Sequence, residues 1–313
     1  MTFSIVALDP DTGEIGVAVQ TCWPAVGATV PWVEPGVGAV ATQAFTNMDL
    51  GPKGLERLRA SVPAQDALRE IVAGDPGREL RQVGMVDAAG RSAAHTGSAC
   101  VAGAGHVCDS GVCIQGNTLE RTGVWLAMLD AYRRATGDLA DRLIAALRAG
   151  DRDGGDVRGS QSAALLVAPG LPDAPPWARR FDLRVDASPR PLEELTRLLR
   201  VARAYETLDA AMAASEAGDL EMALGRTTVA HEAAPEDAQV AFWHAVILLA
   251  SGRPHEARPV LEAALLSEPR LGEFSHRFAD AGHGALIAEV LRSVPRPMAD
   301  GPSLRAGPTK RST

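Results

Sequence analysis

Several kinds of residue and segment are scarce in this sequence, and each scarcity excludes a class of protein. Lys53 and Lys310 are the only lysines among 31 basic residues, and 39 acidic residues bring the net charge to −8. A chain without a basic excess is a poor partner for nucleic acid or for an anionic membrane surface. No run of about 18 apolar residues occurs, which argues against a transmembrane helix. We therefore expect no nucleic-acid partner and no membrane association.

Cysteine is also scarce, and its spacing fits no disulfide framework and no C-x-x-C pair. The start of the chain has neither the basic region nor the apolar stretch of a signal peptide. We therefore expect a cytoplasmic protein with four reduced thiols. His95 and His106 lie among the cysteines, but the spacing matches no zinc signature, so we expect no metal and no other cofactor. The cysteines are Cys22, Cys100, Cys108 and Cys113.

Short apolar runs separated by turn residues predict β-strands in the first part of the chain. Phe3–Leu8 and Ile15–Val19 flank the turn Asp9–Gly13, and Phe181–Val185 alternates apolar with charged residues as a half-exposed strand does. The other expected strands are Val26–Val33, Val37–Ala41, Gln82–Val86, Ser92–Ala94, Val112–Gln115 and Ala163–Ala168.

Two helical pairs interrupt these strands. The first pair is expected at Pro52–Arg59 and Ala64–Ala73, with Ser61 as a plausible cap of the second helix. The second pair has its apolar positions between residues 124 and 132 and between residues 139 and 147, and Asp138 can cap its second helix. This order of elements favours an α/β (α+β) fold with four layers, an αββα sandwich.

From residue 191 the pattern becomes continuously helical, with a repeat of 34 residues. The repeat resembles the tetratricopeptide helix–turn–helix unit. Two repeats and a capping helix near Phe274–Leu291 are fewer than usually fold alone, so we expect self-association or docking through them. The predicted domains are 1–190, 191–293 and a disordered tail, 294–313. The recurring pairs are Gly218 and Gly252, Ala223 and Ala257, Ala230 and Ala264, and Pro235 and Pro269.

Thr2 is the first candidate catalytic residue. Methionine aminopeptidases remove Met1 when a small residue follows, which would leave Thr2 with a free α-amino group at the head of a buried strand. That amine, with a reference pKa of about 7.7–8.0, can act as the base for the Thr hydroxyl. Ser4 is an alternative nucleophile, because residues two apart on a strand share a face.

The segment Thr2–Ala18 resembles the nucleophile strand and hairpin of N-terminal-nucleophile (Ntn) hydrolases such as glycosylasparaginases. More specifically, it resembles a bacterial family of that superfamily that is catalogued without a function, domain of unknown function 1028. The resemblance implies the Ntn sandwich over residues 2 to 190 and no particular substrate. The other matching segments are Gly36–Ala44 (with Gln43), Gly51–Leu55, Arg81–Asp87, His95–Gly97, Gln115–Asn117, Gly155–Gly159, Gln161–Ala164 and Asp182–Asp186.

The remaining candidates are polar residues in these segments. Asn117, at a strand end, can donate its amide to an oxyanion, or it can be an ordinary turn residue. The Gly-rich loop before Ala163 can hold a substrate carboxylate through Arg158, or it can be a simple connection. Lys53 can lower the pKa of the Thr2 amine, or it can be a surface residue. The other predicted substrate-binding residues are Gln43, His95, Asp156, Gln161 and Ser162.

The sequence thus predicts an Ntn-type hydrolase that cleaves an amide or related acyl bond of a small molecule. The alternative is a catalytically silent Ntn scaffold that binds proteins through its helical repeats. A free amino-terminal Thr2 separates the two, because a retained Met1 blocks the base.

Overall fold

The computed structural model describes residues 2–171 and 173–283. Contacts between Cα atoms divide the chain into two units, Met1–Leu199 and Arg200–Thr313. The boundary lies within helix α5 (Pro191–Glu216), a few residues beyond the predicted one. No helix in the described ranges is both long and apolar enough to cross a bilayer.

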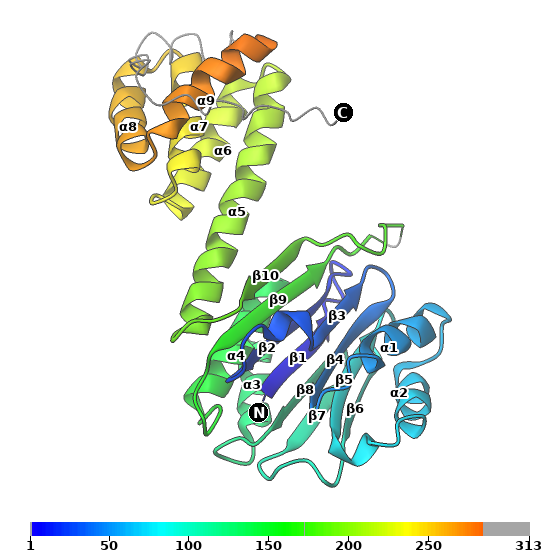
Figure 1. Cartoon of the computed structure of the whole chain (residues 1–313). Helices are drawn as coiled ribbons and strands as arrows, with labels where there is room; N and C mark the ends of the chain where they lie inside the picture. Colours follow the sequence, from blue (N-terminus) through cyan, green and yellow to red (C-terminus); the bar gives the residue numbers. More distant parts are fainter. Residues whose placement is uncertain (1, 172, 284–313) are drawn as a thin grey trace, which may run out of the picture. The chain divides into compact units, whose positions relative to one another are not determined.

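The first unit contains two antiparallel sheets (Figure 1). The larger sheet has the order β10-β9-β2-β1-β8-β7, and the smaller has the order β3-β4-β5-β6. The strands of the larger sheet are β1 (Thr2–Leu8), β2 (Ile15–Thr21), β7 (Gly105–Asp109), β8 (Val112–Asn117), β9 (Ser162–Ala168) and β10 (Phe181–Val185). Those of the smaller sheet are β3 (Pro31–Glu34), β4 (Gly38–Ala44), β5 (Arg81–Asp87) and β6 (Ser92–Thr96).

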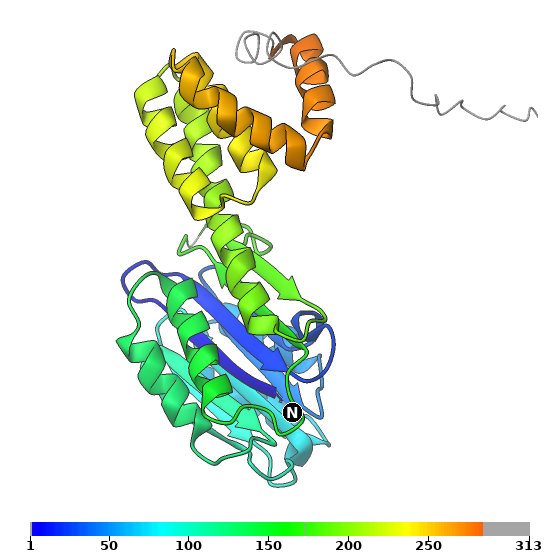
Figure 2. The ribbon, with the colours of Figure 1, turned by 90° about the vertical axis from the view of Figure 1, so that its left-hand side faces the viewer.

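The two sheets pack face to face, and each carries a helical pair on its outer face. Helices α1 (Leu50–Arg59) and α2 (Ala64–Ala73) pack on the smaller sheet. Helices α3 (Val124–Arg134) and α4 (Leu139–Arg152) pack on the larger sheet, over whose strands they lie in Figure 2. The predicted mixed α/β class with a helical C-terminal part is confirmed.

Because side chains alternate along a strand, the larger sheet packs against the helices with one face and against the smaller sheet with the other. Every residue of β1 is buried, because its odd-numbered residues face the helices and its even-numbered residues face the other sheet. Phe3 packs near Gly150 of α4, where an added Cβ would lie 3.0 Å from its ring. Val6 and Leu8 join the apolar cluster between the sheets.

Three local predictions need correction. The expected strand Val26–Val33 is instead a short 3-10 helix, η1 (Val26–Ala28), followed by β3. Strand β7 was not predicted, because its short sequence has a weak apolar alternation. Ser61 does not cap α2, since the main-chain N–H of Ala64 donates to a carboxylate oxygen of Asp87 at 3.1 Å. Asp138 does cap α4, as predicted, by accepting from the N–H of Asp141.

The second unit repeats one helix–turn–helix arrangement. Gly218 and Gly252, 34 residues apart, both adopt positive φ angles, of 83° and 72°, at the turns. The recurring alanines are buried where the helices pack, which explains why small residues recur there. Part of the expected capping helix and the expected disordered tail lie outside the described residues. The helices are the end of α5, α6 (Leu220–Ala233), α7 (Ala238–Ala250), α8 (Pro254–Ser267), α9 (Arg270–Phe278) and the π-helical turn η3 (Ala279–His283).

Candidate functional site

The layer between the two sheets is apolar at one end and polar at the other. Leu8, Ile15 and Val86 belong to the apolar end. The other end begins at Thr2, where buried hydroxyl and amide side chains replace the aliphatic ones. Buried polar groups are costly unless they are hydrogen-bonded, so their partners define what this end can do. The polar residues are Thr2, Ser4, Thr21, Gln43, Gln82, Gln115, Asn117 and Ser162.

Two side-chain amides, those of Gln43 and Asn117, donate to the main-chain carbonyl of Thr2, and the amide oxygen of Gln82 accepts from both. Nε2 of Gln43 donates to Oε1 of Gln82 at 2.7 Å and to the Thr2 oxygen at 3.0 Å. Nδ2 of Asn117 donates to the same Gln82 oxygen at 3.1 Å and to the Thr2 oxygen at 3.4 Å. Gln82 donates in turn to the Gly116 carbonyl at 2.8 Å. This amide network joins the two sheets and fixes the backbone at the head of β1.

Thr2 is the first residue of β1 and lies in register between Thr21 of β2 and Asn117 of β8. Its hydroxyl donates to Oγ1 of Thr21 at 3.1 Å, and the residue is 8% exposed. Oγ1 of Thr21 also accepts from the N–H of Trp23 at 3.4 Å. Within the described residues, the hydrogen-bond partners of Thr2 outside the strand ladder are one hydroxyl and two amides, and none of them titrates.

Ser4 lies further into the layer and is fully buried. Its hydroxyl donates to Oε1 of Gln43 at 2.8 Å and accepts from Nε2 of Gln115 at 3.3 Å. The Gln115 amide lies over Gly84, where an added Cβ would be 3.3 Å from the amide carbon. A glycine at this position leaves room for that amide.

The Gly-rich loop forms a second polar group, next to the end of β2. The Asp156 side chain is 1% exposed and accepts from the N–H of Arg158 at 2.7 Å. Burial raises the pKa of Asp156. Burial, together with the neighbouring Asp156, raises the pKa of the Cys22 thiol to about 11. The N–H of Gln161 donates to the Thr21 carbonyl at 2.8 Å, which ties the loop to the strand beside Thr2.

A hollow of about 430 Å³ borders this loop. Arg158 and Gln161, both predicted to bind substrate, line it. Ser162 instead holds backbone together, because its Oγ accepts from the N–H of Val26 at 3.1 Å and donates to the carbonyl of Trp23. The other lining residues are Cys22, Ser160, Ala187, Ser188 and Pro189.

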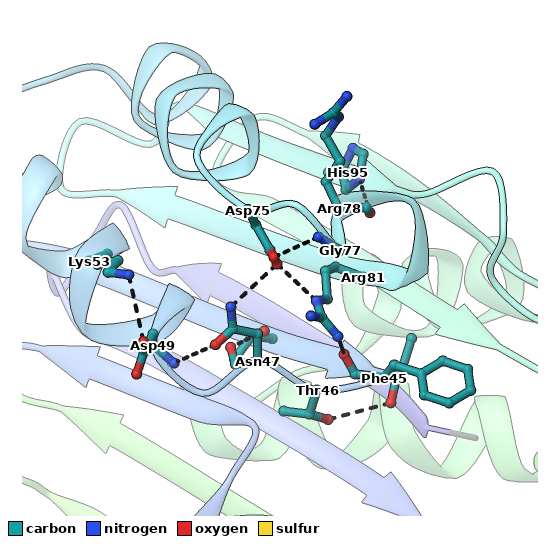
Figure 3. A network of polar contacts seen from close by, with 12 residues as sticks. Phe45, Thr46, Asn47, Asp49, Lys53, Asp75, Gly77, Arg78, Arg81 and His95 are labelled. Atoms are coloured by element: carbon teal, nitrogen blue, oxygen red, sulfur yellow. Dashed lines mark hydrogen bonds and ion pairs between the residues drawn. The ribbon is translucent and has the colours of Figure 1, made fainter.

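Lys53 and His95 do not join either group. Lys53 is on α1, on the outer face of the smaller sheet, and pairs with Asp49 at 3.6 Å (Figure 3). His95 is on β6, where its Nε2 lies 2.9 Å from the carbonyl oxygen of Arg78. The smaller sheet thus separates Lys53 from Thr2, so this lysine does not contact the Thr2 amine.

A separate ionic network holds the loop that follows Gln43 (Figure 3). Nε of Arg81 donates to the Asp75 carboxylate at 2.8 Å, and the same guanidinium donates to the Phe45 carbonyl. Asn47 also donates to Asp75, at 3.3 Å. The Arg81 hydrogen bond is the main cause that lowers the pKa of Asp75 to about 2. The network therefore fixes the β4–α1 loop at the polar end of the sheets.

The cysteine expectation is corrected by a disulfide between Cys108 and Cys113. The two residues lie directly opposite each other in the β7–β8 hairpin, so the turn brings them within reach. Cys22 and Cys100 are free thiols. In the described part of the chain, no group of three or more His, Cys, Asp or Glu side chains is arranged to hold a metal ion.

Three residues of the polar end were not among the predicted site residues, namely Thr21, Gln82 and Gln115. Their signal was present, since each is a polar residue near the end of an otherwise buried strand. Sequence spacing could not place Gln82 beside Thr2, because Gln82 comes from the other sheet.

Fold and site define a protein of two face-to-face antiparallel sheets between helices, with a threonine at the head of an inner strand. Residues 2–195 match a family described as a family of unknown function, DUF1028, and the chain belongs to this family. It is similar to the crystal structure of protein SPO2555 from Silicibacter pomeroyi, which is described with the same family. The two are 35% identical, with a TM-score of 0.59 over 64% of this chain and 85% of that chain. None of the curated proteins matches it.

Proposed function

We propose that this protein is an Ntn-type hydrolase that cleaves an amide or related acyl bond of a small molecule, with Thr2 as its nucleophile. The observation that supports the proposal is the position of Thr2 at the head of β1. Its hydroxyl is hydrogen-bonded to Thr21, and its main-chain carbonyl accepts hydrogen bonds from two side-chain amides. None of these neutral partners can act as a base. We therefore propose that the base is the α-amine of Thr2 itself, which Met1 removal would free, because it requires no other residue.

The proposed reaction has two steps. Oγ1 of Thr2 attacks the substrate carbonyl carbon while the α-amine takes the hydroxyl proton. The amine then gives this proton to the leaving nitrogen as the C–N bond breaks, and water hydrolyses the resulting ester. Thr21 acts as a positioning residue, since its Oγ1 holds the Thr2 hydroxyl before the substrate binds. The hydroxyl hydrogen turns from Thr21 to the α-amine as the attack begins.

Asn117 is the proposed oxyanion donor. Both hydrogens of its amide are engaged, but the bond to the Thr2 carbonyl is 3.4 Å long. A bond of this length is weak, so turning that N–H toward a developing oxyanion costs little. Each such donor typically contributes about 3 kcal/mol to the stabilisation of a transition state.

The burial of Ser4 favours Thr2 as the nucleophile. The Ser4 hydroxyl is bonded to two glutamines inside the layer, so its attack would require both bonds to break. The Gly-rich loop supplies the proposed binding groups. Arg158 lines the hollow, and its Nε lies 3.4 Å from the Asp156 carboxylate, so a substrate carboxylate would bind the rest of a guanidinium that Asp156 already holds.

The test is chemical labelling combined with mass measurement. Intact mass should show a chain lighter by one methionine, and a β-lactone probe should label Thr2. Thr2→Ala should abolish labelling, while Ser4→Ala should retain it if the fold is intact by circular dichroism. Fully active protein that retains Met1 would contradict the mechanism. Labelling at Ser4 would move the chemistry two residues along the strand.

A second function, protein binding through the tetratricopeptide-like helical unit, is favoured by its surface. Val229 and Leu266 are 56% and 84% exposed. A hollow of about 440 Å³ lies between the helices. Small and apolar residues such as Ala241 and Val260 line most of it, and His231, Glu236 and Ser267 complete the lining. Protein that retains Met1 and hydrolyses no amide, ureido acid or lactam in a substrate screen would favour this function over the hydrolase.

A further inference from the structure

Two aromatic side chains are exposed just beyond direct hydrogen-bond partners of Thr2. Trp23 follows Thr21 by two residues and is 64% exposed, and Phe45 follows Gln43 by two residues and is 57% exposed. Aromatic residues make up only 4% of the chain. Among the residues that the structure describes, Trp177 is the other exposed Trp or Phe. Exposed Trp and Phe rings are therefore rare on the described surface, and two of these three lie at this end of the sheets.

Hydrogen bonds order the backbone of both aromatic residues. The N–H of Trp23 donates to Oγ1 of Thr21, and its carbonyl accepts from Ser162. The N–H of Phe45 donates to the Leu80 carbonyl at 3.2 Å, and its own carbonyl accepts from Arg81. Figure 3 shows the Phe45 ring turned away from that ionic network. A ring on a backbone that is already ordered loses little entropy when a ligand covers it.

The two rings come from opposite sheets. Thr21 belongs to the larger sheet and Gln43 to the smaller, and both bond Thr2. Trp23 and Phe45 each follow a residue that bonds Thr2 by two positions. Because one residue spans at most about 3.6 Å of chain, the Cα of each aromatic residue lies within about 7 Å of the Cα of that bonding residue. Trp23 and Phe45 thus lie at the ends of two strands that meet at the proposed nucleophile.

We infer that Trp23 and Phe45 receive an apolar side group of the substrate, so that the preferred class is amides with an aromatic or branched aliphatic acyl group. This inference rests on the proposed function and specifies its substrate. Aromatic side chains offer large contact areas to such groups.

The experiment compares two β-lactone probes that differ only in a methyl or a benzyl substituent. Oγ1 of Thr2 adds to the lactone carbonyl, the ring C–O bond breaks, and the ring oxygen takes the proton, so the chain gains the whole mass of the probe. The rate constant for labelling of Thr2 in the full chain is measured by mass spectrometry. The variants are Trp23→Ala, Phe45→Ala and, as the exposed control in the β9–β10 loop, Trp177→Ala.

We expect the benzyl probe to label Thr2 at least about tenfold faster than the methyl probe, the scale on which apolar contacts discriminate. Each of the first two substitutions should remove most of this difference while leaving the methyl rate nearly unchanged, and Trp177→Ala should change neither rate. Equal rates for both probes at Thr2 would overturn the inference and leave the proposed function standing. A benzyl preference that both variants retain would overturn the assignment to these rings. Failure of both probes to label Thr2 would overturn the proposed function, and this inference with it.

Discussion

At the scale of single residues, the polar end of the inter-sheet layer is built from neutral groups. Thr2, Thr21 and Asn117 come from three neighbouring strands of one sheet, while Gln43 and Gln82 reach across from the other. A buried network of this kind is costly when one member is removed, because the remaining groups lose their partners. The effect of a substitution on activity must therefore be separated from its effect on stability.

Asn117→Ala should lower kcat by about 10²-fold with little change in KM, because an oxyanion donor acts mainly in the transition state. The measurement is kcat and KM with any amide found in the screen, together with thermal unfolding. Gln82→Ala is the matched control, since it removes the acceptor of the Asn117 amide and leaves the donor in place. If both variants lose stability equally and lose activity equally, Asn117 has only a structural role.

At the scale of elements, loops and hairpins are fixed by contacts that bridge them. The Asp75 carboxylate accepts hydrogen bonds from Arg81, Asn47 and the N–H of Gly77, and so ties the α2–β5 connection to the β4–α1 loop. The disulfide does the same within the β7–β8 hairpin.

Asp75→Asn should lower the free energy of unfolding at neutral pH by about 2 kcal/mol, because the native state depresses the pKa of this carboxyl from 3.8 to about 2. A depressed carboxyl pKa stabilises the fold above the unfolded pKa. This stabilisation is lost as the pH falls from about 4 to about 2, so the gap between variant and native protein should close over that range. Urea unfolding at several pH values measures it.

Asp66→Asn is the control for that experiment. Asp66 pairs with Arg69 on the surface of α2, where its side chain is 45% exposed. Exposed pairs contribute about 0–1 kcal/mol. A loss with Asp75→Asn no larger than with Asp66→Asn would contradict the anchoring role of Asp75.

Thiol titration in denaturant should find two free thiols, those of Cys22 and Cys100, before reduction and four after it. Because the disulfide closes a loop of only a few residues, its loss should cost about 2 kcal/mol or less. The double variant Cys108→Ser with Cys113→Ser should therefore remain folded with a modestly lower Tm. Four thiols without reductant would show that the bond does not form in the purified protein.

At the scale of the whole molecule, the unit boundary lies inside α5. Leu192 and Leu195 at its start are buried, and the Arg148 guanidinium of α4 donates to Thr196 at 3.0 Å. The first turns of this helix therefore belong to the sandwich.

A chain truncated after Leu199 should keep the sheet signal in circular dichroism and unfold cooperatively. A chain truncated after Asp186 should be less stable, because it lacks the buried side chains of Leu192 and Leu195, which are worth about 2 kcal/mol each. Thermal melts of the two truncated chains beside the full chain measure the difference. Loss of sheet signal in the longer truncated chain alone would show that the boundary is wrong.

The sequence by itself determined only local features of the structure. The hairpin of β1 and β2, the cap at Asp138 and the glycines at Gly218 and Gly252 follow from periodicity and from φ/ψ preferences, which neighbouring residues set. Strand β7 was not predicted, because its five residues show too little alternation of apolar and polar side chains.

Only the tertiary structure decided which polar residues meet. Asn117 and Gln43 reach Thr2 across 115 and 41 residues of chain. Asp87 caps α2 although the two are 23 residues apart. Lys53 lies on the outer face of the smaller sheet, whereas Thr2 lies on the opposite side of that sheet. These relations depend on strand order and on the packing of the two sheets. Those are set by burial summed over the whole chain, and no local pattern encodes them.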